Sequence, residues 1–188
     1  IIGTSSIRRK IQILELRSDL LVTDLRGNVG TRLKKLENDE YDAIILAKAG
    51  LKRLGCLNDK KYKICDLKEM IPAAGQGAIG VEALSNNNRV KKIFARLNCS
   101  NTFRCVMEER KIIKKLGGDC GSPIAVFAKQ KNKILKMQAF VGDIVGSNSI
   151  RTVANFPENC SVNAGESLAN VLIKLGALRL VAGQRGLE

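Results

Sequence analysis

The first 55 residues alternate between short apolar runs and amphipathic segments, and this alternation restricts the fold more than any other feature. Apolar runs lie at 20–25 and 42–47, and helical periodicity is found at about 6–17, 31–38 and 49–54. Strands that alternate with helices form βαβ units with parallel strands. The pattern therefore predicts an α/β domain with a mostly parallel sheet, in which ligands bind at the carboxyl ends of the strands.

Two arginine-bearing turns lie where those strands are expected to end. They are GTSSIRR at 3–9 and RGNVGTR at 26–32, and each precedes a predicted helix. The start of a helix presents free N–H groups and positive potential, and arginine binds carboxylate or phosphate through two parallel hydrogen bonds. Two such turns predict a ligand with several negative groups. The net charge of +14 agrees with such a ligand, although a lysine-rich solvated surface would give the same charge.

The pattern changes in the second half of the chain. From residue 78 onward it predicts one strand, two helices, three antiparallel strands and a final helix. These elements are expected at 78–84, 89–97, 101–116, 124–129, 134–141, 150–156 and 164–175. A helix packed across three antiparallel strands is an α+β unit. We therefore expect a small α+β domain after the α/β domain, with the boundary near Cys99.

A glycine-rich segment at 75–80 (GQGAIG) has the spacing of a dinucleotide-binding fingerprint. That fingerprint follows a strand, opens a helix and has an acidic residue about twenty positions later. Here Pro72 lies just before the glycines, a strand is predicted after them, and residues 95–100 contain no carboxylate. We interpret the segment as a tight turn or hinge.

Six cysteines are present, without a C-x-x-C pair and without histidine, so a zinc site has little support. Cys120 lies between glycines and follows a lysine-rich helix, where positive charge favours the thiolate. This setting suits a covalent attachment point, and a loop cysteine without function is the alternative. The other five cysteines are interpreted as small apolar filler.

No residue in this sequence is a convincing acid–base catalyst. Histidine, the usual general base near neutral pH, is absent. Asp42 begins a predicted strand and is interpreted as a cap rather than as a base. Lys48 follows the same strand and is a candidate for the binding cleft.

Five stretches together resemble the porphobilinogen deaminase (hydroxymethylbilane synthase) family. They are GTSSIRR at 3–9, LRGNVGTRL at 25–33, YDAIILAKAGLKRLG at 41–55, PAAGQGAIGVE at 72–82 and GGDCGSPI at 117–124. They follow the family's order over essentially the whole chain. The resemblance implies a transferase of heme and chlorophyll (porphyrin) biosynthesis. It joins four porphobilinogen molecules head to tail, loses ammonia at each step and releases the linear tetrapyrrole hydroxymethylbilane.

The same resemblance implies which residues bind the ligand. A dipyrromethane cofactor is expected on a thioether to Cys120. Its carboxylates, and those of the substrate, are expected to meet the arginines and small residues of the two turns. The implied cofactor-binding residues are Thr4, Ser5, Ser6, Arg8, Arg9, Arg26, Gly27 and Arg32, and the implied substrate-binding residues are Arg8, Arg26, Arg32 and Arg53.

The family fold implies three regions in this chain. Residues 1–71 match domain two, which resembles a periplasmic binding protein. Residues 72–98 match a segment that returns to domain one, and residues 99–188 match the α+β domain three. Most of domain one, which holds the family's catalytic aspartate, has no counterpart here. We therefore expect a piece of a longer protein that is inactive alone, with its missing segment either present as a separate chain or lost. Asp119, before Cys120, departs from the small residue common in the family.

The resemblance also implies a monomer that acts on porphobilinogen and binds neither nucleic acid nor membrane. The expected location is the cytoplasm, with the plastid as the alternative. A non-enzymatic module that binds nucleic acid or a heparin-like polyanion is the competing hypothesis. Salt-dependent binding to such a polymer, without a pyrrole adduct, would favour it.

Overall fold

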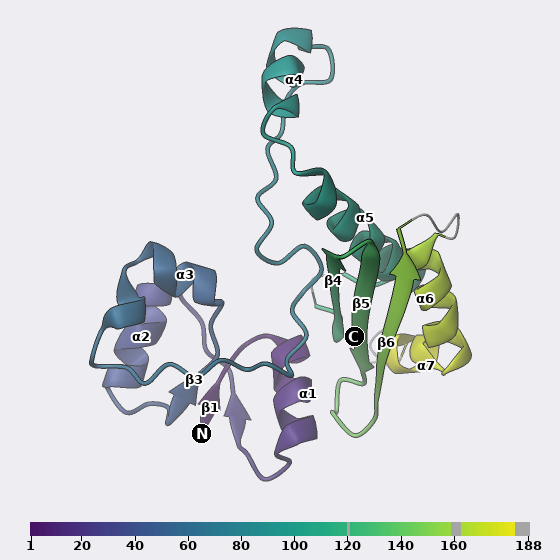
Figure 1. Cartoon of the computed structure of the whole chain (residues 1–188). Helices are drawn as coiled ribbons and strands as arrows, with labels where there is room; N and C mark the ends of the chain where they lie inside the picture. Colours follow the sequence, from purple (N-terminus) through teal and green to yellow (C-terminus); the bar gives the residue numbers. More distant parts are fainter. Residues whose placement is uncertain (120, 159–162, 183–188) are drawn as a thin grey trace.

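The computed structural model describes residues 1–119, 121–158 and 163–182. It contains a three-stranded parallel sheet with helices and a separate three-stranded antiparallel sheet with helices (Figure 1). The parallel sheet lies in the first part of the chain and the antiparallel sheet in the last part. The predicted fold class is thereby confirmed.

The parallel sheet has the strand order β2-β1-β3, formed by Val22–Thr23, Ile2–Gly3 and Ala43–Ile44. Helix α1 (Ile7–Leu16) connects β1 to β2, and α2 (Val29–Glu37) connects β2 to β3. These strands are shorter than predicted. The central strand β1 ends where the chain turns at Thr4 to begin α1, so its two neighbours pair over the same short length.

The antiparallel sheet has the order β4-β5-β6. The strands are Ile124–Lys131, Ile134–Gly142 and Ser149–Pro157, and the helices around them are α5 (Ser100–Lys115), α6 (Ala164–Lys174) and α7 (Ala177–Ala182). The strands and the helices α5 and α6 agree with the predicted positions to within a few residues, whereas the short final helix α7 was not predicted. Helices α5, α6 and α7 cover one face of this sheet (Figure 1).

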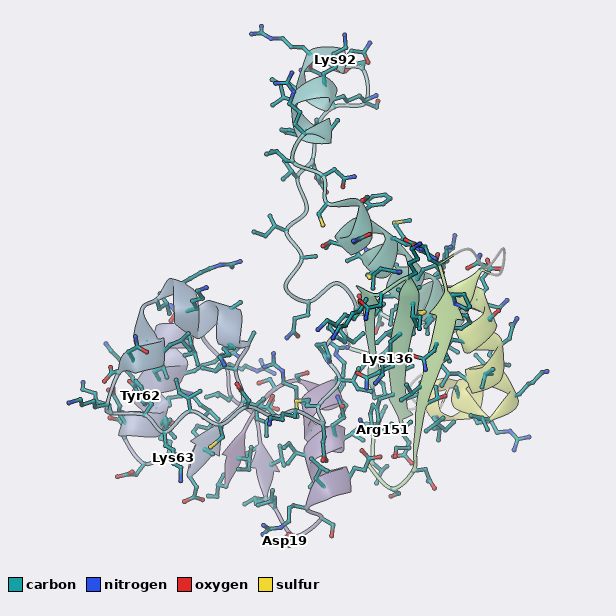
Figure 2. The ribbon with its side chains drawn as sticks, viewed as in Figure 1. Asp19, Tyr62, Lys63, Lys92, Lys136 and Arg151 are labelled. Atoms are coloured by element: carbon teal, nitrogen blue, oxygen red, sulfur yellow. The ribbon has the colours of Figure 1, made fainter. Side chains whose placement is uncertain are left out.

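Helix α1 covers part of the opposite face of the antiparallel sheet. Its Ile11 packs in one buried cluster with Ile71 and with Phe140 of β5. Arg151 of β6 lies 5.2 Å from the centre of the Phe140 ring and forms an ion pair with Glu15 of α1 (Figure 2). The helix that begins at the first arginine turn is therefore packed directly against the second sheet.

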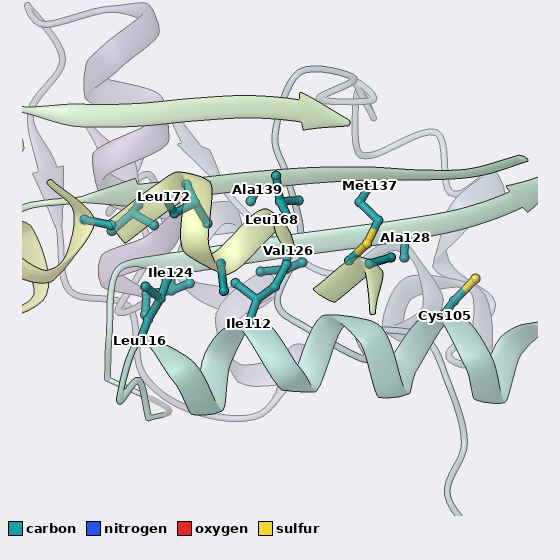
Figure 3. Close-up of a cluster of buried hydrophobic side chains, with 14 of the residues drawn as sticks. Cys105, Ile112, Leu116, Ile124, Val126, Ala128, Met137, Ala139, Leu168 and Leu172 are labelled. Atoms are coloured by element: carbon teal, nitrogen blue, oxygen red, sulfur yellow. The ribbon is translucent and has the colours of Figure 1, made fainter. Parts of the chain in front are cut away.

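The larger core lies between the antiparallel sheet and its helices (Figure 3). Ile112 of α5, Met137 of β5 and Leu172 of α6 are completely buried there. Alternating residues of β5 point into this core, as expected for a strand with one covered face.

The predicted strand at 78–84 is wrong, because these residues form no regular secondary structure. Ile79, Val81 and Leu84 alternate as in a strand, but they are 78%, 56% and 75% exposed. A strand requires a neighbouring strand for its backbone hydrogen bonds, and no described segment supplies one here. The chain continues into α4 (Asn88–Ala95), which extends away from both sheets (Figure 1).

The glycine-rich segment is a turn, as predicted. Gly75 and Gly77 have φ angles of 71° and 93°, a region that L side chains rarely adopt. The short helices α3 (Lys48–Arg53) and η1 (Cys56–Asn58) complete the described elements, and Gly55 joins them with a φ of 72°.

A buried carboxylate anchors the glycine turn to the edge of the antiparallel sheet. Glu109 of α5 accepts hydrogen bonds from the N–H of Gly75 at 2.5 Å and from that of Ala128 at 2.7 Å. The neighbouring Val126 N–H donates to the Pro72 carbonyl at 3.1 Å. Burial raises the pKa of Glu109, which is 4% exposed. The Glu109 carboxylate thus accepts a hydrogen bond from the edge strand β4 that a neighbouring strand would otherwise accept.

Replacing Glu109 by alanine should lower the free energy of unfolding by about 2–5 kcal/mol, since each of two buried N–H groups loses its partner. Glu166→Ala is the matched control because Glu166 is exposed on α6. Urea unfolding, followed by circular dichroism, measures both. Equal stability losses in the two variants would contradict an anchoring role for Glu109.

Candidate functional site

Hydroxyl side chains fix the shape of the first arginine turn. Thr4 is buried, and its hydroxyl oxygen accepts a hydrogen bond from the Ser6 N–H at 3.2 Å. The Ser5 hydroxyl donates to the Leu25 carbonyl at 2.8 Å, which links the first turn to the strand that leads into the second. Ser6 is the N-cap of α1, and its side chain makes no capping hydrogen bond.

Arg8 joins this turn to the loop that carries the candidate attachment cysteine. Its Nη1 donates to the carbonyl oxygens of Ser122 at 3.1 Å and Ile124 at 3.2 Å. Cys120 itself lies outside the described residues, as does Cys160. The residues that follow Cys120 are thus held against the arginine turn, although 114 positions separate Arg8 from Ser122.

Asp119 closes the loop around position 120. Its carboxylate accepts hydrogen bonds from the Gly121 N–H at 2.9 Å and from the Ser122 hydroxyl at 2.7 Å. The Ser122 hydroxyl oxygen in turn accepts from the Asp119 N–H. The Ser122 hydroxyl, followed by the Gly121 N–H, lowers the pKa of Asp119. This residue therefore has a structural role in the loop, which accounts for a carboxylate next to the cysteine.

Three arginines are close enough to interact electrostatically. Burial lowers the pKa of Arg9, and the charges of Arg32 and Arg8 lower it further. Arg9 donates to the Ile45 carbonyl at 2.9 Å, and Arg32 donates through Nε to the Gly27 carbonyl at 2.7 Å. Neither Arg9 nor Arg32 forms an ion pair with any carboxylate in the described part of the chain. Such a concentration of positive charge favours an anionic ligand.

The second turn is preorganised by its glycine and its cap. Gly27 has a φ of 113°, and a Cβ there would lie 2.9 Å from Thr31. The Asn28 side chain caps α2 by accepting from the Thr31 N–H at 2.8 Å. Glycine at position 27 lets the carbonyl face Arg32, which explains why both residues occur in the motif.

Arg26 and Arg53 lie apart from this group. The Arg26 side chain is 85% exposed, and its nearest carboxylate is Asp24 at 3.6 Å. Arg53 is exposed at the end of α3. The structure thus brings Arg8, Arg9 and Arg32 together and leaves the other two candidate arginines in solvent.

A cavity of about 550 Å³ opens beside Arg8 and Arg9. Its polar lining includes Ser6 and Lys48, and its apolar lining comes largely from α2, β3 and α3. The apolar residues include Leu33, Leu36, Ile44, Ile45 and Leu51. One wall is formed by residues 62–68, which the sequence pattern did not identify because they have neither helical nor strand periodicity. A cationic rim over an apolar floor suits an organic carboxylate of small-molecule size.

The cysteines and the remaining candidate residues differ in their surroundings. Cys105 is buried, which raises its thiol pKa and agrees with a role as apolar filler. Cys65 and Cys99 are exposed, so that interpretation is wrong for them, because both lie outside the two hydrophobic cores. Asp42 accepts a hydrogen bond from the Ile1 amino group and is exposed.

The described residues contain no cluster of three or more potential metal ligands, and none of their helices has the length and apolarity needed to cross a membrane.

Residues 1–92 match the family profile described as porphobilinogen deaminase, dipyromethane cofactor binding domain, and residues 103–174 match that of the porphobilinogen deaminase C-terminal domain. The chain belongs to the porphobilinogen deaminase family. It is 41% identical over 187 residues to porphobilinogen deaminase of Sulfurovum sp. (strain NBC37-1), and 42% identical over 181 residues to that of Campylobacter hominis. Each alignment covers 96% of this chain and 58% of the relative, so the chain spans little more than half of their length.

The arginine cluster fits the cofactor that the family profile names. Dipyrromethane carries an acetate and a propionate on each pyrrole, so it presents several carboxylates on two pyrrole rings that a methylene group joins. Arg9 and Arg32 have no carboxylate partner in the described chain, and they lie near Arg8, which contacts the cysteine loop. Cations and hydroxyl groups at the carboxyl ends of parallel strands are suitable donors for such a group.

Lysine at position 32 should impair cofactor assembly more than lysine at position 26. Arg32 uses Nε to hold the Gly27 carbonyl and keeps its remaining N–H groups for a ligand, whereas lysine offers a single ammonium. Loss of a charge-assisted hydrogen bond costs about 1.5–3 kcal/mol, or roughly ten- to a hundredfold in binding. The test compares the rate of pyrrole attachment in the two variants, each joined to the part of a relative that this chain does not span, and follows that rate by intact mass spectrometry. Wild-type rates in both variants would contradict a bidentate role.

Proposed function

We propose that this chain supplies the arginine-lined cleft and the cofactor-attachment loop of a porphobilinogen deaminase, or hydroxymethylbilane synthase. Such an enzyme joins four porphobilinogen molecules head to tail into hydroxymethylbilane. The contact of Arg8 with Ser122 and Ile124 carries the proposal, because it holds the residues that follow Cys120 beside the cationic cluster. Membership of the porphobilinogen deaminase family supports it.

The chemistry places a clear demand on these residues. In each condensation, a carbon–carbon bond forms between a pyrrole ring carbon and the methylene of the next porphobilinogen. Ammonia leaves, and the attacked ring loses a proton. Four porphobilinogen molecules and one water therefore give one hydroxymethylbilane and four molecules of ammonia. Bound through a thioether to Cys120, dipyrromethane supplies the pyrrole carbon on which the first substrate is added.

The residues of this chain bind and orient the carboxylates during that sequence. Arg8, Arg9 and Arg32 hold acetate and propionate groups, while the hydroxyls of Ser5 and Ser6 line the same turn. Arg26 and Arg53, exposed in the described chain, take carboxylates as the product grows. The apolar cavity floor accepts the pyrrole rings.

The exposed segment at 72–98 completes a domain outside this chain. Its exposed apolar residues, among them Ile79, Val81, Ile93 and Leu97, need a neighbouring sheet or helix to bury them. We assign residues 1–71 to domain two and residues 99–188 to domain three, with 72–98 docked on domain one. The part of the relatives that this chain does not span provides the partner. We further infer that the whole enzyme is a monomer in the cytoplasm.

The stoichiometry of the reaction tests the proposed function. The chain is joined to the N-terminal part of the Sulfurovum relative and supplied with porphobilinogen. Ammonia and tetrapyrrole are then quantified, the latter by mass spectrometry. We expect four molecules of ammonia for each hydroxymethylbilane. Porphobilinogen binding without ammonia release would contradict the proposal.

A further inference from the structure

A second cation lies in the same cavity as Arg9, and a carboxylate of the protein covers it. The Nζ of Lys48 donates to both carboxylate oxygens of Asp66, at 2.9 and 3.1 Å. Lys48 and Asp66 both line the cavity. Asp66 is the one acidic residue in the lining that the structure describes. Its carboxylate binds the Lys48 ammonium group, which would otherwise be available to an organic carboxylate.

The cavity wall that carries Asp66 is attached by few hydrogen bonds. Residues 63–66 make no backbone–backbone hydrogen bond with any part of the chain that the structure describes. Side chains hold the wall instead: the Tyr62 hydroxyl bonds to Glu37 of α2, and Asp66 bonds to Lys48 of α3. Figure 2 shows Tyr62 and Lys63 on the side of α2 and α3. Movement of Asp66 would therefore break little of the backbone structure.

We propose that Lys48 is a further carboxylate-binding residue of this cavity. Asp66 pairs with Lys48 in the absence of ligand, and a ligand carboxylate takes the position of the Asp66 carboxylate on binding. In the proposed function, which this inference extends, that carboxylate belongs to a pyrrole acetate or propionate. The exchange leaves the Lys48 ammonium with one carboxylate partner throughout.

The exposure of both side chains makes this exchange feasible. Lys48 and Asp66 are 60% and 57% exposed, and ion pairs at such positions contribute little to stability. Asp66 returns to solvent when it leaves. A ligand with several carboxylates binds Lys48 more favourably than Asp66 does, because the other carboxylates of the ligand contact Arg8 and Arg9 on the same cavity lining.

Removing the competing carboxylate should tighten binding. Asp66→Asn is expected to bind a tricarboxylate about two- to fivefold more tightly than the unaltered chain, which corresponds to the worth of an exposed ion pair. The probes are tricarballylate and porphobilinogen, titrated by calorimetry into the 188-residue chain. Asp19→Asn is the matched control, because Asp19 forms an ion pair of similar exposure with Arg17 outside the cavity lining (Figure 2).

A double variant separates exchange at Lys48 from a general effect of charge. If Asp66 competes for Lys48, Asp66→Asn should give no gain in a chain that also carries Lys48→Gln. If the double variant still binds the probe more tightly than Lys48→Gln alone, the lost negative charge acts through long-range electrostatics and not by freeing Lys48. That result would overturn the proposal. Lys52→Gln combined with Asp66→Asn is the control, because Lys52 lies one turn further along α3 and outside the cavity lining.

Chemical labelling gives a second, independent readout. Saturating tricarballylate should protect Lys48 from acetylation, as mapped by peptide mass spectrometry, and should leave Lys52 reactive. Binding of tricarballylate but not porphobilinogen would leave the Lys48 inference intact and count against the pyrrole ligand. An equal affinity of Asp66→Asn and Asp19→Asn for both probes, or no binding of either probe, would overturn the role of Lys48.

Discussion

Replacing Cys120 by serine is expected to remove all covalent pyrrole from the protein. A thioether requires sulfur, and serine has nearly the same size, so the loop should keep its shape. The Asp119 and Ser122 hydrogen bonds that close this loop do not use the side chain at position 120. Intact mass spectrometry of protein extended with the rest of a relative should show an increment of two pyrrole units in the unaltered protein and none in Cys120→Ser.

Cys99→Ser provides a demanding control for this experiment. Cys99 is exposed, and hydrogen bonding to Thr102 lowers its thiol pKa. It is therefore a reactive alternative on chemical grounds alone. It lies at the start of α5, whereas the carbonyls that contact Arg8 follow Cys120. The increment should survive in Cys99→Ser, and a pyrrole-modified peptide containing Cys99 would refute attachment at Cys120.

Local patterns predicted most of the elements correctly. The β6 strand (Ser149–Pro157) alternates between exposed and half-buried residues along its whole length, which is the period-two signal that identified it. The start of the first helix was also recognisable, because small polar residues there precede an amphipathic run, whereas α2 begins at Val29, two residues before its predicted start. These signals depend on neighbours in the sequence, and so they can be read without the fold.

The features that sequence patterns missed depend on distant parts of the chain. The segment at 78–84 has a strand pattern, but pairing needs a partner that the described chain does not provide. The contact between Arg8 and Ser122 spans 114 positions, so no spacing rule points to it. The motif predicts Arg8 as a binding residue, and the fold adds that Arg8 contacts the residues that follow Cys120. Local patterns pointed to the arginines of the candidate site but not to its wall at 62–68.

The isolated 188-residue chain is expected not to consume porphobilinogen. Loss of ammonia requires a proton donor at the leaving amine and a carboxylate that stabilises the positive charge on the pyrrole. Histidine is absent, and the cavity lining in the described chain contains a single carboxylate, Asp66, which pairs with Lys48. The Asp119 carboxylate is bound by Gly121 and Ser122. The described cavity lining thus offers cations suited to an anionic ligand but no unpaired carboxylate for the chemistry.

Turnover should appear when the rest of a relative is supplied, since the chain spans 58% of those proteins and exposes the apolar residues Ile79 and Leu84. The comparison measures ammonia release by the chain alone, by the chain joined to the N-terminal part of the Sulfurovum relative, and by both parts mixed. We expect no release in the first case and release in the second.

A charged side chain at position 79 tests whether this residue docks on the added part. Ile79→Asp in the joined protein should then reduce activity, whereas Val145→Asp should not, because Val145 is similarly exposed but lies in the loop between β5 and β6. Steady ammonia release by the purified chain alone would place the catalytic carboxylate within these residues, and Asp66 would then be the first to test because it faces the cavity.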